Sequence, residues 1–127
     1  MFMFLVTTFT SLTLNIGTVL AQQTIYIRSD GSVDPSTAPI SRSGNIYTFT
    51  ANIYESIVIE RDNIIINGNN YLLQGSPPSY GFTLTSRNNV TIRNVFITGF
   101  RYGIYLKSST NNNIERSALA NNDRGGI

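Results

Sequence analysis

Apolar and polar residues alternate along this chain in short runs, and the runs recur at a fixed interval. The stretch at residues 88–106 reads as three short strands separated by turns. Within it, YGIYL at residues 102–106 repeats YGFTL at residues 80–84 after 22 residues. The same interval separates Ile92 from Ile114 and Ile97 from Leu119. A period near twenty residues built from short β-type runs indicates stacked repeats rather than a closed domain.

From residue 63 the alternation divides the chain into coils of three strands each, which together form the predicted repeat region at residues 63–127. The predicted strands are residues 64–66, 71–73 and 82–84, then 90–92, 95–97 and 104–106, then 112–114, 118–119 and a strand beginning near Gly125. The first coil is longer than the second, and one insertion falls at residues 75–79. We expect this segment to bulge outward without disturbing the strands.

Alternate side chains of a strand point to the same face, so each predicted strand has an inward row. The residues predicted to point inward are Ile64, Ile66, Val90, Ile92, Val95, Ile97, Ile104 and Leu106. A single coil buries too little apolar surface to offset the entropy lost on ordering its backbone. The coils must therefore stack, with each strand pairing above and below at a spacing of about 4.8 Å.

Residues 22–62 precede the regular period and are predicted to form an N-terminal capping segment that covers the first apolar layer. Strands are expected at residues 24–28, 46–50 and 56–60, and a long loop rich in turn signals at residues 29–44. At the other end the sequence stops where the repeat would begin another strand, and an open coil exposes strand edges. We therefore expect the sequence to be the N-terminal part of a longer protein.

Residues 1–21 form an uncharged run of apolar and hydroxyl side chains. Val19 and Ala21 fit a signal-peptidase site, although the usual positive n-region is missing. The alternative is a retained membrane anchor. Either interpretation predicts export to the cell surface, the periplasm or the extracellular space, with membrane contact only through this segment.

Asparagine recurs at the predicted corners of the coils. The corner residues singled out are Asn63, Asn67, Asn89, Asn94 and Asn112. Asparagine tolerates the left-handed backbone that corners need, and stacked amides can form hydrogen-bonded ladders. The alternative, ordinary loop polarity, explains the abundance but not the repeated placement. The sequon at residues 89–91 is interpreted as incidental, because a corner residue occupies its first position.

The amino-acid composition limits the kinds of ligand and catalytic site that the chain can carry. Charged residues make up 13% of the chain, and the net charge of +2 is scattered, so nucleic-acid binding is not predicted. The pI of about 9.2 reflects scarce acidic residues rather than a basic patch. The chain has no cysteine and no histidine, which excludes disulfides, the usual structural zinc sites and the commonest general base.

Two longer stretches carry a resemblance to a known family. They are SIVIERDNIIINGNNYLLQG at residues 56–75 and NNVTIRNVFITGFRYGIYLKSSTNNNI at residues 88–114. Both resemble the right-handed parallel β-helix repeat proteins, and among these the NosD-like group, which is named for a periplasmic copper-binding protein. The resemblance implies an all-β, right-handed parallel β-helix with three sheets, located outside the cytoplasm. It implies no particular reaction.

An enzyme acting on polysaccharides is one functional class to weigh. A glycosidase needs two carboxylates facing each other across the scissile bond. Glu60 and Asp62 could face outward together at a strand end, but a solvated corner explains them more simply. No catalytic residue is therefore assigned. Whether the whole protein is an enzyme stays open, with an active site in further C-terminal coils as the alternative.

Copper handling is the second class, suggested by the name of the similar group. Copper sites use histidine, cysteine or methionine sulfur. The only methionines are Met1 and Met3, within the expected export segment. The sequence therefore predicts no metal site and no cofactor.

The third class, which we favour, is an exported non-catalytic module with a structural or glycan-binding role. Phe96, Arg101 and Tyr105 are predicted to point outward or to lie at a corner, where an aromatic ring beside an arginine can hold a sugar. The alternative is ordinary sheet surface, where aromatic residues are favoured anyway. The predicted partner is a polysaccharide or cell-surface glycan. The sequence does not indicate an oligomeric state.

Overall fold

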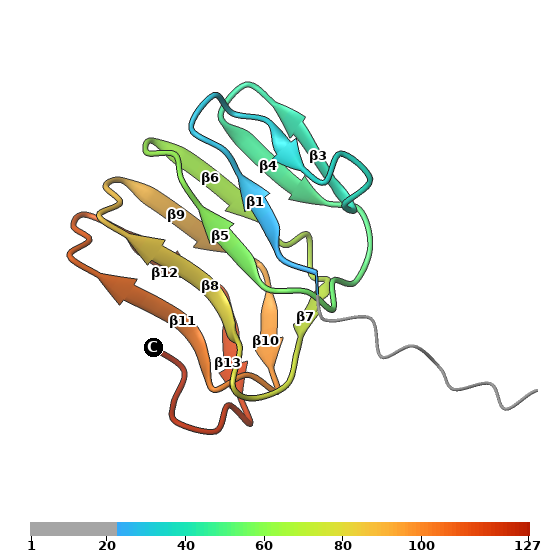
Figure 1. Cartoon of the computed structure of the whole chain (residues 1–127), viewed down its shortest axis with the longest axis vertical. Helices are drawn as coiled ribbons and strands as arrows, with labels where there is room; N and C mark the ends of the chain where they lie inside the picture. Colours follow the sequence, from blue (N-terminus) through green and yellow to red (C-terminus); the bar gives the residue numbers. More distant parts are fainter. Residues whose placement is uncertain (1–22) are drawn as a thin grey trace, which may run out of the picture.

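The computed structural model describes residues 23–127 (Figure 1). The expected export segment at residues 1–21 lies outside these described residues. Within them the chain forms thirteen strands and no helix, and no helix that is long and apolar enough to cross a membrane is found there. The strands assemble into three sheets, here called A, B and C, which stack coil upon coil (Figure 1).

Each sheet is built from strands that are distant in sequence. Sheet A contains, in spatial order, β11 (Tyr102–Lys107), β8 (Tyr80–Thr85), β5 (Ile57–Ile59), β1 (Ile25–Ile27) and β2 (Val33–Asp34). Sheet B contains β12 (Asn113–Glu115), β9 (Val90–Arg93), β6 (Ile64–Asn67), β4 (Ile46–Phe49) and β3 (Ile40–Ser43). Sheet C contains β13 (Ala118–Ala120), β10 (Phe96–Thr98) and β7 (Leu72–Gln74). The predicted all-β, three-sheet solenoid is confirmed.

The register of the parallel strands reproduces the period of the sequence. Residues that are one period apart pair directly: Phe82 with Ile104, Ile92 with Ile114, and Ile97 with Leu119. Ile66 pairs with Ile92 across the longer first coil. The insertion at residues 75–79 is a loop between β7 and β8, and the pairing on both sides of it is intact.

The predicted loop at residues 29–44 is wrong in part. It contains β2 and β3, which pair antiparallel with β1 and β4. Both strands are short and largely exposed, so they lack the apolar alternation that identifies a strand. They form the edges of sheets A and B, while β1, β4 and β5 already pair in parallel within the stack.

Aliphatic and aromatic residues fill the interior of the stack. No polar or charged residue among those the structure describes is buried. Seven of the eight residues predicted to point inward are buried, at 0–3% exposure; these are Ile64, Ile66, Val90, Ile92, Val95, Ile97 and Ile104. The predicted burial of Leu106 is wrong. It is 37% exposed, because β11 is the outermost strand of sheet A and no further strand covers its end.

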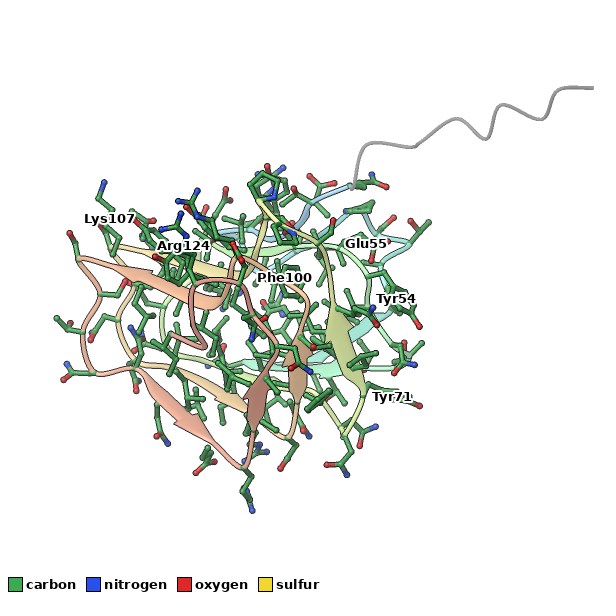
Figure 2. The ribbon with its side chains drawn as sticks, turned by 90° about the horizontal axis from the view of Figure 1, so that it is seen from below. Tyr54, Glu55, Tyr71, Phe100, Lys107 and Arg124 are labelled. Carbon is green, nitrogen blue, oxygen red and sulfur yellow. The ribbon has the colours of Figure 1, made fainter. Side chains whose placement is uncertain are left out.

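Two large aromatic residues in the core were not anticipated. Phe100 lies in the turn between β10 and β11, yet it is fully buried inside the coil (Figure 2). Gly75 makes room for it, because a Cβ at Gly75 would overlap the Phe100 ring. Tyr47 is equally buried in β4, where its hydroxyl donates a hydrogen bond to the carbonyl oxygen of Gly31 at 2.7 Å.

Candidate binding surface

Three tyrosines pack together on the outside of sheet A; we call Tyr80, Tyr102 and Tyr105 the tyrosine cluster. The rings of Tyr80 and Tyr105 are nearly parallel, with centroids 4.8 Å apart and an interplanar angle of 12°. Tyr102 is tilted against both, at centroid distances of 5.8 Å and 6.3 Å. Each side chain is half-buried. The cluster spans the two neighbouring strands β8 and β11.

The glycine after each strand-initial tyrosine explains how the cluster forms. A Cβ on Gly81 would overlap the carbonyl oxygen of Gly103 and would lie 3.1 Å from Cγ2 of the core residue Ile97. Gly81 and Gly103 therefore occupy inward positions that admit no side chain. Tyr80 and Tyr102 are half-buried, whereas the two residues after each of them are buried, so the tyrosines lie on the outer side of the strands. Each Tyr-Gly pair thus places a tyrosine at the same outer position of its coil, and Tyr80 pairs directly with Tyr102.

The tyrosine cluster offers both apolar and polar contacts. None of its three hydroxyl groups makes a hydrogen bond within residues 23–127, so all three remain available to a partner. Arg101 directly precedes Tyr102, and the backbone N–H of Arg124 donates to the carbonyl oxygen of Arg101 at 2.7 Å. In the part of the chain that the structure describes, neither arginine takes part in an ion pair.

The structure separates Phe96 from the other two predicted surface residues. Tyr105 belongs to β11 of sheet A and Arg101 precedes that strand, whereas Phe96 begins β10 of sheet C. Phe96 is 41% exposed and borders a shallow hollow of about 180 Å³. The other residues lining the hollow are Asn70, Asn94, Val95, Arg116 and Ala118. Sequence reasoning named Tyr105 but missed Tyr80 and Tyr102, although the repeated YG was a usable signal.

The predicted corner asparagines differ in what they do. Asn63, Asn89 and Asn94 adopt left-handed backbone conformations, with φ of 55–58°. Asn89 donates from Nδ2 to Oδ1 of Asn63, and Asn94 donates likewise to Asn67, each at 3.0 Å. Asn67 itself ends β6 and lacks the left-handed φ. The side-chain amide of Asn89, the first residue of the sequon at residues 89–91, is therefore engaged in a contact between two corners.

In the third coil, corner side chains bind the backbone of the coil before them. Asn112, also without a left-handed φ, accepts a hydrogen bond from the N–H of Val90 at 2.9 Å. Asn122 accepts from the N–H of Phe100 at 3.1 Å and donates to the carbonyl oxygen of Ile97. Ser109 and Ser117 accept in the same way from backbone N–H groups, again 22 residues earlier. These side chains replace backbone partners where the strands bend and the ladder is interrupted.

The two carboxylates weighed as a catalytic pair are engaged elsewhere. Glu60 forms an ion pair with Arg28 at 3.2 Å, and Asp62 forms one with Arg87 at 3.4 Å. Asp62 also accepts a hydrogen bond from the N–H of Asn88 at 3.0 Å. Their contacts are those of solvated corners. Across residues 23–127 no group of three or more acidic, histidine or cysteine side chains is arranged to hold a metal ion.

A comparison with protein families assigns this solenoid. The family model described as periplasmic copper-binding protein (NosD) matches residues 15–127. The chain belongs to the NosD family. No curated protein and no solved structure gives a significant match. The family resemblance stated from the sequence is therefore confirmed.

The donor atoms of this NosD-family chain do not fit copper. Histidine and cysteine are absent from the sequence, and its two methionines stand at positions 1 and 3. Copper binding in proteins relies on imidazole nitrogen and on thiolate or thioether sulfur. Among residues 23–127, the carboxylates of Asp34, Glu60, Asp62 and Glu115 form ion pairs with arginines. We therefore derive no chemistry through a metal.

Proposed function

We propose that this chain is an exported, non-catalytic module of the NosD family that binds glycans on the tyrosine cluster. The observation that carries the proposal is the outward packing of Tyr80, Tyr102 and Tyr105 on adjacent strands. Nothing in the core requires these rings, because the inward positions of the same strands are already filled by Phe82, Leu84 and Ile104.

The chemistry of the cluster suits a sugar. Tyrosine combines a large apolar face with a hydroxyl that donates and accepts hydrogen bonds. A pyranose ring has the matching combination of C–H faces and hydroxyl groups. Arg101, which directly precedes Tyr102 in the chain, carries a guanidinium group with several N–H donors. A rigid sheet holds the rings in place, so little side-chain entropy is lost on binding.

Two further observations support the proposal, one on cleavage and one on export. Glu60 and Asp62, two carboxylates close in sequence, are held by Arg28 and Arg87. The family description as periplasmic supports export. The alternative remains that a longer protein carries these coils and has a polysaccharide-degrading active site elsewhere.

A polysaccharide array probed with the purified full chain tests the proposal, with release of reducing sugar measured in parallel. We expect retention without cleavage, and at least about a tenfold loss of affinity, equal to about 1.4 kcal/mol, in Tyr102→Ala/Tyr105→Ala. Tyr54→Ala is the matched control. Tyr54 is 56% exposed, and it lies on the opposite side of the molecule from Lys107 of β11 (Figure 2).

Three outcomes would reject the proposal. Release of reducing sugar would establish the enzyme alternative. Equal loss of binding in Tyr54→Ala and the double variant would show that the cluster is not the site. No retained glycan across the array would remove the binding function.

A further inference from the structure

Two arginines converge on one glycine at the end of the stack that carries β2 and β3. Gly31 follows β1 with a φ of +90°, and its backbone is buried. A Cβ there would overlap Nη1 of Arg61 and would lie 2.5 Å from Cζ of Arg42. Both guanidinium groups therefore lie against the same Cα, in space that only glycine leaves open.

Both side chains are anchored by the turn between β3 and β4. Arg42 donates from Nε to the carbonyl oxygen of Gly44 at 2.9 Å. Arg61 donates from Nη2 to Oδ1 of Asn45, the next residue, at 3.3 Å. The buried Tyr47 ring lies 5.6 Å from the Arg42 guanidinium. The two cations are held close together by contacts that leave other N–H groups of each unused.

The charges of this arginine pair are not balanced. Elsewhere in residues 23–127 the arginines that form ion pairs are Arg28, Arg87 and Arg116. Arg42 and Arg61 form none. Adjacent like charges are unfavourable unless an anion is shared between them.

Asp30 is the acidic group beside the pair, and it is directed mainly to another partner. Its Oδ1 accepts hydrogen bonds from the N–H and the hydroxyl of Ser32, at 2.9 Å and 2.7 Å. Those hydrogen bonds, followed by the charges of Arg42 and Arg61, hold the pKa of Asp30 below its ordinary value. One carboxylate beside two guanidinium groups leaves a net positive charge.

We propose that Arg42 and Arg61 form an oxyanion subsite, which makes acidic glycans the ligand class of this module. The inference rests on the glycan-binding function proposed above. Planar guanidinium groups bind oxyanions through paired N–H donors. A carboxylate and a sulfate ester on a glycan are therefore both suitable ligands for Arg42 and Arg61.

Calorimetric titration of the full chain tests the subsite with three probes: an oligogalacturonate, a sulfated oligosaccharide and a neutral oligosaccharide of similar length. We expect Arg42→Ala/Arg61→Ala to lose about tenfold in affinity for the acidic probes and to keep its affinity for the neutral one. The oligogalacturonate and the sulfated probe distinguish carboxylate from sulfate recognition. Arg116→Ala is the control, because it removes a cation from a different corner.

A second variant tests the subsite without removing an arginine. Asp30→Asn keeps an acceptor for Ser32 but removes the competing charge, so it should strengthen binding of the acidic probes by about threefold, and less so at high salt. Unchanged acidic binding in both variants, or an equal loss for Arg116→Ala, would overturn the subsite. Retained neutral binding in that case would leave the glycan-binding function standing. If the unaltered chain binds none of the three probes, both proposals are rejected.

Discussion

The two faces of β8 and β11 carry different residues of the same repeat, which serve different purposes. On the inner face Phe82 and Ile104 are fully buried and pair directly across the strands. On the outer face Tyr80, Tyr102 and Tyr105 contact mainly one another. Phe82 lies between the neighbouring strands β5 and β11, and the backbone N–H of Ile104 donates to the carbonyl oxygen of Gly126 beyond the edge of the sheet. The outer tyrosines are only half-buried. The comparison predicts that stability and binding can be altered separately on a single strand.

Phe82→Ala should have the largest effect on stability. Phe82 is fully buried in a central layer, and its ring lies 6.4 Å from that of Phe49. Loss of the ring leaves a cavity. We therefore expect the free energy of unfolding, measured by urea titration, to fall by about 3–5 kcal/mol. Tyr105→Ala on the outer face should cost less than about 1.5 kcal/mol. Equal losses for the two variants would contradict the separation of the faces.

Gly81→Ala should rank next, because it places a methyl group between two coils. The new Cβ would overlap the carbonyl oxygen of Gly103, which is backbone and cannot rotate away. We expect a loss of about 3 kcal/mol in thermal or urea unfolding. Gly44→Ala is the matched control, since Gly44 has a left-handed φ of 58° but open space around its Cα. It should cost only about 1 kcal/mol, from backbone strain alone.

Asn122→Ala should have a smaller effect, confined to a corner. The N–H of Phe100 would lose its acceptor while the Phe100 side chain stays buried. We expect a destabilisation of about 1–2 kcal/mol, measured by urea unfolding. Asn113 is exposed and makes no side-chain hydrogen bond in the described part of the chain, so Asn113→Ala should be nearly neutral. If Asn122→Ala and Asn113→Ala lower the free energy of unfolding equally, the hydrogen bonds of Asn122 do not stabilise the corner.

The stacked pair Tyr80 and Tyr105 should show the smallest effect on stability. A double-mutant cycle with Tyr80→Leu and Tyr105→Leu isolates the contact between the two rings, at 4.8 Å and 12°. The expected coupling is about 0.5–1.5 kcal/mol. A coupling of zero would mean that the rings do not hold one another in place in solution.

The repeat spacing made most of the architecture predictable from sequence. Because strands one period apart pair directly, the interval of 22 residues predicts the register of β8 with β11. The same reasoning identified seven buried residues of the inward rows. It failed at Leu106, because alternation sets the direction of a side chain while neighbouring strands set its burial.

Other features do not follow from the alternation of apolar residues. The strands β2 and β3 are recognisable only by their antiparallel pairing with β1 and β4. The tyrosine cluster depends on Gly81 and Gly103, whose inward placement breaks the simple alternation. The arginine pair joins Arg42 to Arg61 through Gly31, and their separation along the chain gives no local signal of this contact.

The central claim is that the outer face of sheet A, and not the hollow beside Phe96, receives the glycan. Chemical-shift mapping by NMR on the labelled full chain, titrated with an oligosaccharide that it retains, tests this most directly. We predict that a neutral oligosaccharide shifts Tyr80, Arg101, Tyr102 and Tyr105 most, that an acidic one also shifts Arg42 and Arg61, and that Tyr54 and the buried Phe82 stay nearly unchanged. Shifts concentrated on Phe96 and Arg116 instead would place the ligand on sheet C and contradict the proposed surface.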